Sequence, residues 1–224
     1  MTFENSFSVA LSARLQQAAV IAVLVIDDAD DALPLAESLW DGGVRAIELT
    51  LRTPAATDAL ARIRKHFPQI IAGAGTVLTP TQVNEAADAG AAFAVAPGTN
   101  PAVIKAAANI RLPFAPGIAT PSDIESALQS GCRLMKYFPA EHLGGMAYLR
   151  AIANPYAHLQ LQFIPLGGID QENASDYLRD PLVHSIGGSW IAPRGLIRQR
   201  DWKTITQRAS EAAKLSIQPP GEAG

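Results

Sequence analysis

Short apolar runs alternate with longer amphipathic stretches along the whole chain. The apolar runs have the length and β-branched content of buried strands, while the stretches between them repeat apolar residues at helical spacing. The pattern predicts strands near residues 20–26, 46–51, 70–76, 93–97, 114–118, 133–138, 162–166 and 183–187. It predicts helices near residues 6–18, 30–42, 54–66, 80–89, 101–109, 121–130, 144–153, 171–178 and 201–214.

An opening helix followed by eight strand–helix units favours one fold. Strands that alternate with helices indicate a parallel sheet, and eight such units close a (β/α)8 barrel. We therefore predict an α/β TIM barrel with an extra N-terminal helix, as a single domain over residues 1–224, with 216–224 as a disordered tail. The alternative is a doubly wound open sheet, which needs an edge strand at each end. The first and last predicted strands are as apolar as the others, and this favours the barrel.

The predicted helix boundaries carry capping signals. A cap residue followed by proline, the preferred first helical residue, occurs four times: Thr53-Pro54, Thr79-Pro80, Asn100-Pro101 and Thr120-Pro121. Glycines at Gly42-Gly43, Gly90 and Gly131 mark helix ends.

Composition excludes several classes of protein. The net charge is -3 and the basic residues are dispersed, which argues against a nucleic-acid or anionic membrane surface. The apolar run 18–26 is far shorter than the ~20 residues of a membrane span. The single cysteine, Cys132, fits a reducing cytoplasm and a small buried side chain better than a nucleophile. The four histidines form no ligand-spaced pair, so we predict no metal site.

Lys136 is the most unusual residue of any predicted strand. Period-two alternation places Leu134, Lys136 and Phe138 on one apolar face of strand 133–138. Lysine is rarely fully buried without a partner, because its ammonium group is strongly hydrated. Two explanations compete: an internal ion pair, or an amine that is kept partly neutral and attacks a carbonyl.

Strand 46–51 also directs polar side chains toward the barrel axis. Alternation places Glu48, Thr50 and Arg52 on the interior face. A buried Glu–Arg pair that satisfies itself is the structural explanation. Because barrel active sites lie at the carboxyl ends of strands, the arrival of Lys136 at the same rim favours a catalytic role.

Small residues and glycine pairs mark the ends of three further strands. Residues 72–76 read Ala-Gly-Ala-Gly-Thr, so a ligand can approach the backbone and meet the Thr76 hydroxyl. Tight packing explains these glycines but not the threonine. Gly167-Gly168 and Gly187-Gly188-Ser189 end strands seven and eight, where many barrels bind phosphate.

Together these segments resemble the KDPG/KHG aldolase family, class I aldolases of keto-deoxy sugar acids. The resemblance covers nearly the whole chain, from Val20 to about Ala213. The matching segments are Gly42-Gly43-Val44-Arg45, Glu48-Leu49-Thr50-Leu51-Arg52-Thr53, Gly73-Ala74-Gly75-Thr76-Val77-Leu78, Ala96-Pro97-Gly98, Pro116-Gly117-Ile118-Ala119-Thr120, Lys136-Tyr137-Phe138-Pro139-Ala140-Glu141, Gly167-Gly168-Ile169 and Gly187-Gly188-Ser189-Trp190.

The resemblance implies a role for each site residue. Lys136 corresponds to the Schiff-base lysine, and Glu48 to the general acid/base, which works through a bound water. The implied substrate contacts are Arg52 and Thr76 for the pyruvate carboxylate, Pro97 and Phe138 for the pyruvyl pocket, and Gly167, Gly168 and Ser189 for the sugar phosphate.

The activity that the resemblance implies is cleavage of a small, phosphorylated keto-deoxy sugar acid. The leading substrate is 2-keto-3-deoxy-6-phosphogluconate, which gives pyruvate and glyceraldehyde 3-phosphate. A further one is 4-hydroxy-2-oxoglutarate, which gives pyruvate and glyoxylate. The family resemblance also implies a cytoplasmic homotrimer of the Entner-Doudoroff pathway, with no cofactor and no metal.

The residue chemistry is consistent with that activity. A free lysine amine has a pKa of ~10.4 and is a poor nucleophile at neutral pH. An apolar wall and a neighbouring guanidinium both disfavour the charged form of an amine. Once the amine condenses with a 2-oxo acid, the iminium accepts the electrons of the C3–C4 bond. A carboxylate must then take the C4 hydroxyl proton.

Two positions depart from the family pattern. Tyr137 replaces a phenylalanine that many members carry, and its parity points it away from the barrel axis. Leu166 stands where phosphogluconate aldolases usually have threonine, which removes one hydrogen bond beside the distal substrate. This raises the alternatives of the galactonate epimer or 4-hydroxy-2-oxoglutarate as substrate.

Two rival functions remain for the same barrel. One is a sugar-phosphate isomerase or epimerase with Glu48 as base and Lys136 as electrostatic stabiliser. The other is a non-enzymatic barrel that assembles as an oligomer, although a scaffold alone gives no reason for Lys136, Glu48, Arg52 and Thr76.

Overall fold

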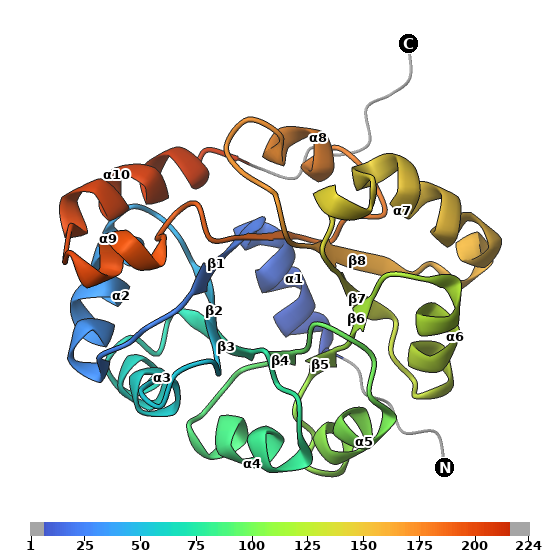
Figure 1. Cartoon of the computed structure of the whole chain (residues 1–224), viewed down its shortest axis with the longest axis horizontal. Helices are drawn as coiled ribbons and strands as arrows, with labels where there is room; N and C mark the ends of the chain where they lie inside the picture. Colours follow the sequence, from blue (N-terminus) through green and yellow to red (C-terminus); the bar gives the residue numbers. More distant parts are fainter. Residues whose placement is uncertain (1–6, 216–224) are drawn as a thin grey trace.

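A computed structural model describes residues 7–215, so the predicted tail at 216–224 lies outside the described residues. Parallel strands form the centre of the molecule and helices surround them (Figure 1). The strands are β1 Val20–Leu24, β2 Ala46–Thr50, β3 Ile71–Gly75, β4 Ala94–Val95, β5 Phe114–Ala115, β6 Gly117–Ile118, β7 Leu134–Tyr137, β8 Gln162–Pro165 and β9 Ile186–Gly188.

The α-helices are α1 Val9–Ala18, α2 Ala32–Asp41, α3 Ala56–His66, α4 Pro80–Asp88, α5 Pro101–Asn109, α6 Pro121–Gln129, α7 Gly145–Ala153, α8 Ala174–Leu178, α9 Arg194–Arg198 and α10 Trp202–Ala212. Three 3-10 segments are η1 Ala29–Asp31, η2 Glu141–Leu143 and η3 Asn154–Leu159.

The strands close into the predicted barrel. Their hydrogen bonds give two sheets, in the orders β5-β4-β3-β2-β1-β9 and β6-β7-β8. Two parallel bridges, Phe163 with Val183 and Leu166 with Gly187, join β8 to the last strand. β5 and β6 are the two halves of the predicted strand 114–118, separated by Pro116, which has no N–H to give to a neighbour. The first strand pairs with the last, so the open sheet is wrong and the (β/α)8 barrel is confirmed.

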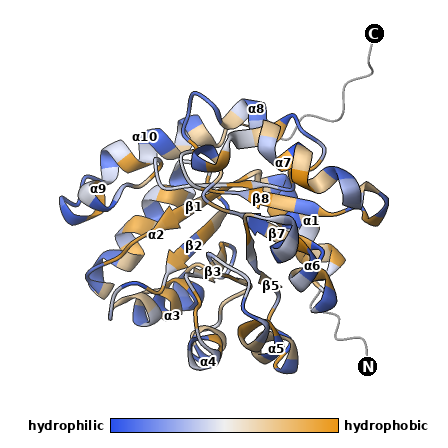
Figure 2. Ribbon diagram, turned by 45° about the vertical axis from the view of Figure 1, so that its right-hand side comes forward, coloured by the Kyte–Doolittle hydropathy of each residue, from blue (hydrophilic) through white to orange (hydrophobic). Residues whose placement is uncertain are grey.

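Apolar residues fill two separate layers. The larger layer lies between strands and helices and includes Ile47 and Leu49. The smaller layer fills the barrel interior and includes Ile21 and Phe93, together with Leu15 of α1. Helix α1 therefore closes the amino-terminal end of the barrel and leaves the carboxyl end for the site. Figure 2 shows apolar strands at the centre and hydrophilic outer helix faces.

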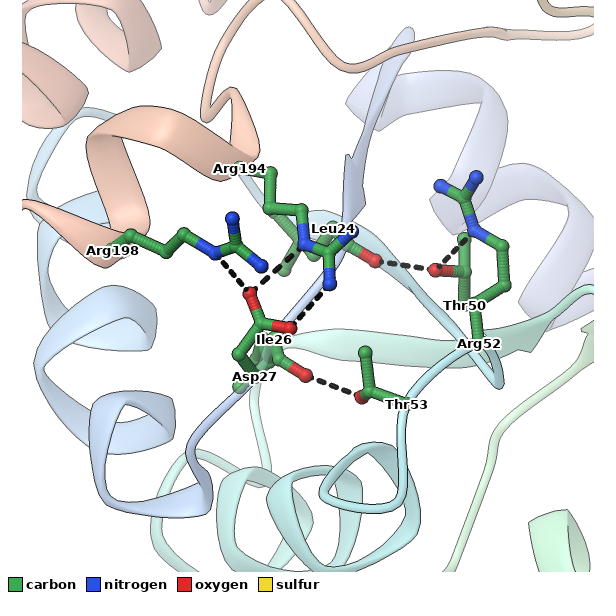
Figure 3. Close-up of polar contacts among 8 residues, drawn as sticks. All are labelled: Leu24, Ile26, Asp27, Thr50, Arg52, Thr53, Arg194 and Arg198. Carbon is green, nitrogen blue, oxygen red and sulfur yellow. Dashed lines mark hydrogen bonds and ion pairs between the residues drawn. The ribbon is translucent and has the colours of Figure 1, made fainter.

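Three of the four predicted caps are confirmed. The side chains of Thr79, Asn100 and Thr120 accept backbone N–H bonds at the starts of α4, α5 and α6. The boundary at Thr53-Pro54 is wrong, because the Thr53 hydroxyl donates to the Ile26 carbonyl instead (Figure 3). Helix α3 therefore begins two residues after Pro54.

The sequence pattern missed the short helix α9, and helix α8 begins three residues later than predicted. No helix in the described part of the chain is long and apolar enough to cross a membrane.

Candidate active site

Lys136 and Glu48 meet inside the barrel. Strand β7 carries the lysine and β2 the glutamate, and Nζ lies 3.0 Å from Oε1 and 3.4 Å from Oε2. Their side chains are only 6% and 3% exposed. The structure thus contains the ion pair that the sequence offered as one explanation for Lys136. The partner is the carboxylate predicted as the general acid/base, so the contact compensates the buried charge and brings the two predicted catalytic groups together.

The small residues of β3 make room for this pair. A Cβ at Gly75 would lie 2.0 Å from Glu48 Oε1, and one at Gly73 would lie 2.4 Å from the Phe93 ring. The prediction that these glycines leave space for a ligand is wrong in this respect, because side chains of the protein occupy that space. Gly75 is small because the Glu48 carboxylate lies against it.

Aromatic and proline residues border the lysine. The Lys136 ammonium lies 5.5 Å from the centroid of the half-buried Phe138 ring. Gly117 is the register partner of Lys136 on the neighbouring strand, and a Cβ there would lie 2.2 Å from the carbonyl carbon of Pro97. Pro97 therefore lies two strands away from the lysine, with the strand of Gly117 between them, consistent with its predicted place in the wall of the pocket.

The polar end of β2 forms the rim of the barrel. Thr50 Oγ1 donates to the Leu24 carbonyl at 3.0 Å and accepts from Arg52 Nε at 3.2 Å (Figure 3). Arg52 is exposed. The buried Glu–Arg pair considered from the sequence is wrong, because Glu48 pairs with Lys136 while Arg52 is held by a hydroxyl. The remaining guanidinium N–H groups of Arg52 are not engaged by that hydroxyl.

Thr76 lies at the end of β3 in a strained backbone conformation. Its φ is 56°, in the left-handed region that a β-branched residue rarely adopts. Such outliers gather at functional sites, because the surrounding structure must hold them in place. The position is consistent with the predicted role of the half-buried Thr76 as a ligand contact.

The two glycine loops lie side by side at the same rim. Leu166 and Gly187 form a parallel bridge. Continued for two residues along each chain segment, the same register places Gly168 beside Ser189. Gly167 and Gly168 have φ values of 95° and 82°, which favour glycine. Both Gly168 and Ser189 are exposed. The predicted distal residues are therefore brought together on neighbouring loops.

Side chains of the protein pack over the other glycine pair. A Cβ at Gly187 would lie 2.5 Å from the Leu166 side chain, and one at Gly188 would lie 1.5 Å from the Trp190 ring. Leu166 is 4% exposed and belongs to the interior apolar layer. Trp190 Nε1 is buried with no hydrogen-bond partner in the described chain. The wall at this end is thus more apolar than a threonine at position 166 would make it.

Tyr137 faces away from the axis, as its parity predicts. Its hydroxyl donates to the carbonyls of Ala140 and Gly145, and burial raises its pKa to about 12. Sequence reasoning missed the neighbouring bond from the Tyr177 hydroxyl to Glu141. Burial and then this bond raise the pKa of Tyr177. The bond fixes the segment after Lys136 against α8, and no pattern in the sequence pairs these two residues.

A second missed feature is an ion-pair cluster at the rim. Arg194 donates to Asp27 through Nε at 2.9 Å and through Nη2 at 2.5 Å, and Arg198 Nε donates to it at 2.7 Å (Figure 3). The bonds from the two arginines hold the pKa of Asp27 well below its usual range. They connect the loop after β1 with α9, across the seam where the barrel closes. The basic residues near 194–200 were visible in the sequence, but their acidic partner was not.

Within residues 7–215, no three His, Cys, Asp or Glu side chains lie close enough together to hold a metal ion. The candidate site consists of Lys136, Glu48 and the groups around them.

Known proteins match this chain closely. The family described as KDPG and KHG aldolase matches residues 11–208. A KHG/KDPG aldolase of Escherichia coli (strain K12) is 43% identical over 195 residues, which is 87% of this chain and 91% of that protein.

Solved structures match equally well. The KDPG aldolase of Legionella pneumophila, captured with pyruvate as a covalent carbinolamine intermediate, is 40% identical with a TM-score of 0.85, over 90% of this chain and 97% of that one. The 2-keto-3-deoxy-6-phosphogluconate aldolase of Zymomonas mobilis ZM4 with 3-phosphoglycerate is 38% identical with a TM-score of 0.84, over 91% and 95% of the two chains. With a matching family profile over most of its length and relatives at this identity, the chain belongs to the KDPG and KHG aldolase family.

Proposed function

We propose that this protein is a class I aldolase that cleaves 2-keto-3-deoxy-6-phosphogluconate to pyruvate and glyceraldehyde 3-phosphate. The observation that carries the proposal is the buried contact of 3.0 Å between Lys136 Nζ and Glu48 at the carboxyl end of the barrel. The relative that was captured with pyruvate as a covalent carbinolamine supports it, because that intermediate needs an amine nucleophile.

The geometry suggests the order of proton transfers. Glu48 accepts a proton from Lys136, and the neutral Nζ attacks C2 of the keto acid to give a carbinolamine. Glu48 returns that proton to the carbinolamine hydroxyl, which leaves as water and gives the iminium. The C3–C4 electrons then enter the iminium as the C4 hydroxyl proton passes to the carboxylate, which releases the aldehyde and leaves an enamine. Protonation at C3 and hydrolysis release pyruvate and restore the amine.

The other site residues bind and orient the substrate in this proposal. Arg52 and Thr76 hold the carboxylate of the pyruvyl half, and a guanidinium can bind it through two parallel hydrogen bonds. Pro97 and Phe138 form the apolar wall that keeps water from the iminium. Gly167, Gly168 and Ser189 receive the phosphate, and the Zymomonas relative with 3-phosphoglycerate supports a phosphorylated ligand.

Leu166 favours a second candidate substrate. Its buried side chain offers no hydroxyl to the distal half of the substrate. Cleavage of the galactonate epimer or of 4-hydroxy-2-oxoglutarate is therefore the alternative within the same mechanism. A pyruvate-release assay with the phosphorylated and unphosphorylated keto-deoxy acids separates these substrates by their kcat/KM values.

Borohydride trapping tests the mechanism itself. With pyruvate present, we expect reduction to attach the three-carbon acid covalently to Lys136, as peptide mass spectrometry detects. Lys136→Ala should lose both the adduct and pyruvate-forming cleavage but remain folded, whereas Lys105→Ala on the outer helix α5 should keep both. An unmodified Lys136 peptide, or full turnover by Lys136→Ala, would favour an isomerase or a non-enzymatic barrel instead.

We also propose that the protein acts as a cytoplasmic homotrimer in the Entner-Doudoroff pathway. The family resemblance supports the trimer, and the single buried Cys132 is consistent with a reducing compartment. Light scattering coupled to size-exclusion chromatography tests the subunit count, and a mass of one or two chains would contradict it.

A further inference from the structure

A basic cavity lies at the end of the barrel opposite the candidate active site. Its volume is about 380 Å³, within the usual range for ligand pockets. The residues that line it are Arg14, Gln17 and Ala18 of α1, with Arg45, Gln69 and Ile71 from the entries to β2 and β3. Arg45 directly precedes β2 and stands three residues before Glu48, or roughly 10 Å along an extended chain. The interior apolar layer separates the two sites.

The charge of this cavity is unbalanced. Among the described residues, no carboxylate lines it and neither Arg14 nor Arg45 forms an ion pair. Two arginines at the opposite rim differ, because Arg194 and Arg198 are both paired with Asp27. The α1 helix ends here, but its partial negative charge of roughly one half is smaller than two full positive charges.

The two guanidinium groups are exposed, and each donates to a backbone carbonyl with donors to spare. The Arg45 guanidinium stacks 3.8 Å above the centroid of the Trp40 ring, and its Nη1 donates to the Trp40 carbonyl at 2.7 Å. Arg14 Nη2 donates to the Gln69 carbonyl at 3.2 Å. Each guanidinium carries five N–H donors, so several of them remain. The side-chain amides of Gln17 and Gln69, with no hydrogen bond to other described residues, add further donors.

We infer that this cavity binds a small anion with two or more phosphate or carboxylate groups. Guanidinium groups suit such ligands, because their planar fork binds oxyanions through paired hydrogen bonds. The volume suits a compact metabolite rather than a nucleotide. The inference goes beyond the proposed aldolase and is independent of it, since none of the lining residues belongs to the candidate active site.

Calorimetric titration of the full chain tests the inference, with sodium pyrophosphate and citrate as probes at constant ionic strength. Pyrophosphate binding alone would indicate a phosphate ligand, and citrate binding alone a carboxylate. We expect Arg14→Gln/Arg45→Gln to weaken binding by at least about tenfold, which corresponds to about 1.4 kcal/mol. Arg14→Gln alone, which removes one exposed contact, should give a smaller loss in the same direction.

Arg133→Gln is the matched control. Arg133 precedes β7 at the same end of the barrel and, like Arg14, donates to one backbone carbonyl, that of Leu159, at 3.2 Å. The Arg133→Gln variant should bind both probes as tightly as the unmodified protein does. Saturating pyruvate should not compete with either probe. No binding of either probe at millimolar concentration, equal affinity in the double variant, an equal loss in Arg133→Gln, or competition by pyruvate would each overturn the inference.

Discussion

At the scale of single residues, Glu48 meets two demands with one carboxylate. It compensates the buried ammonium of Lys136, and in the proposed mechanism it is the base that takes the proton of that amine. Breaking a buried ion pair by removing one partner is costly, because the other charge is left uncompensated. The same contact thus couples the stability of the site to its chemistry.

Replacing Glu48 with glutamine separates these roles. The amide keeps the shape of the side chain but cannot take a proton, so we expect Glu48→Gln to lower kcat by about 10²–10⁴-fold. Lys136 remains, so borohydride should still trap pyruvate on it, although more slowly. Glu85→Gln on the exposed face of α4 should leave kcat unchanged. A Glu48→Gln variant with normal kcat would show that another group moves the proton.

Gly75→Ala tests the space that the carboxylate occupies. The new Cβ would lie 2.0 Å from Glu48 Oε1, so the carboxylate must move away from Lys136. A displacement of about 1 Å can lower catalysis by about 100-fold, and we expect a loss of kcat of that order. Gly195→Ala, whose Cβ meets no atom within 4 Å, should have normal kinetics. Unchanged kcat in Gly75→Ala would mean that the position of Glu48 is not critical.

The sequence predicted the members of this site better than their contacts. Period-two alternation identified Lys136 and Glu48, because it assigns side chains to faces of strands. It did not show that they pair, since 88 positions separate them and strand pairing across the barrel sets their distance. The purpose of Gly75 was misassigned for the same reason.

At the scale of elements, the sequence predicted a helix cap correctly where the capping side chain has no competing partner outside its own helix. Thr120 and Asp123 form a complete capping box at the start of α6. Thr53 has the same local sequence signal, but the Ile26 carbonyl of a neighbouring segment competes for its hydroxyl. The short helix α9 offers too few residues for periodicity to detect it.

The capping box gives a prediction about stability. We expect Thr120→Ala to lower the free energy of unfolding by about 1 kcal/mol, because the backbone N–H of Asp123 loses the Thr120 hydroxyl that caps it. Ser122→Ala, two residues further into the same helix, should be neutral or slightly stabilising, since alanine is the better helix former. Urea denaturation followed by circular dichroism measures both. Equal stabilities of the two variants would contradict a capping role for Thr120.

At the scale of the whole molecule, helix α1 closes the amino-terminal end of the barrel. The alternation of strands and helices predicted the closed barrel and the opening helix. It did not predict that α1 is tied down by the buried His184 near β9, whose Nε2 lies 2.9 Å from Ser12 Oγ. A lone histidine in a strand carries no sign of its partner, so the sequence alone does not place His184 against α1.

This buried imidazole makes the whole fold sensitive to acid. Burial lowers the pKa of His184 to about 4, against an ordinary value of 6.5, and the contact with Ser12 opposes only part of that shift. The unfolded chain therefore takes up a proton at a higher pH than the folded chain does. The stability that neutral His184 permits is complete above pH 6.5 and declines as the pH falls from 6.5 to about 4.

The decline attributable to His184 is about 3 kcal/mol at most, since one pKa unit corresponds to about 1.4 kcal/mol. His184→Asn can keep a hydrogen bond to Ser12 but does not titrate, so its free energy of unfolding should fall less steeply across this pH range. His158→Asn, at an exposed position, should follow the unmodified protein. Urea titrations at several pH values measure the three slopes. Because the carboxylates contribute equally to all three proteins, parallel slopes would mean that His184 does not control the acid response.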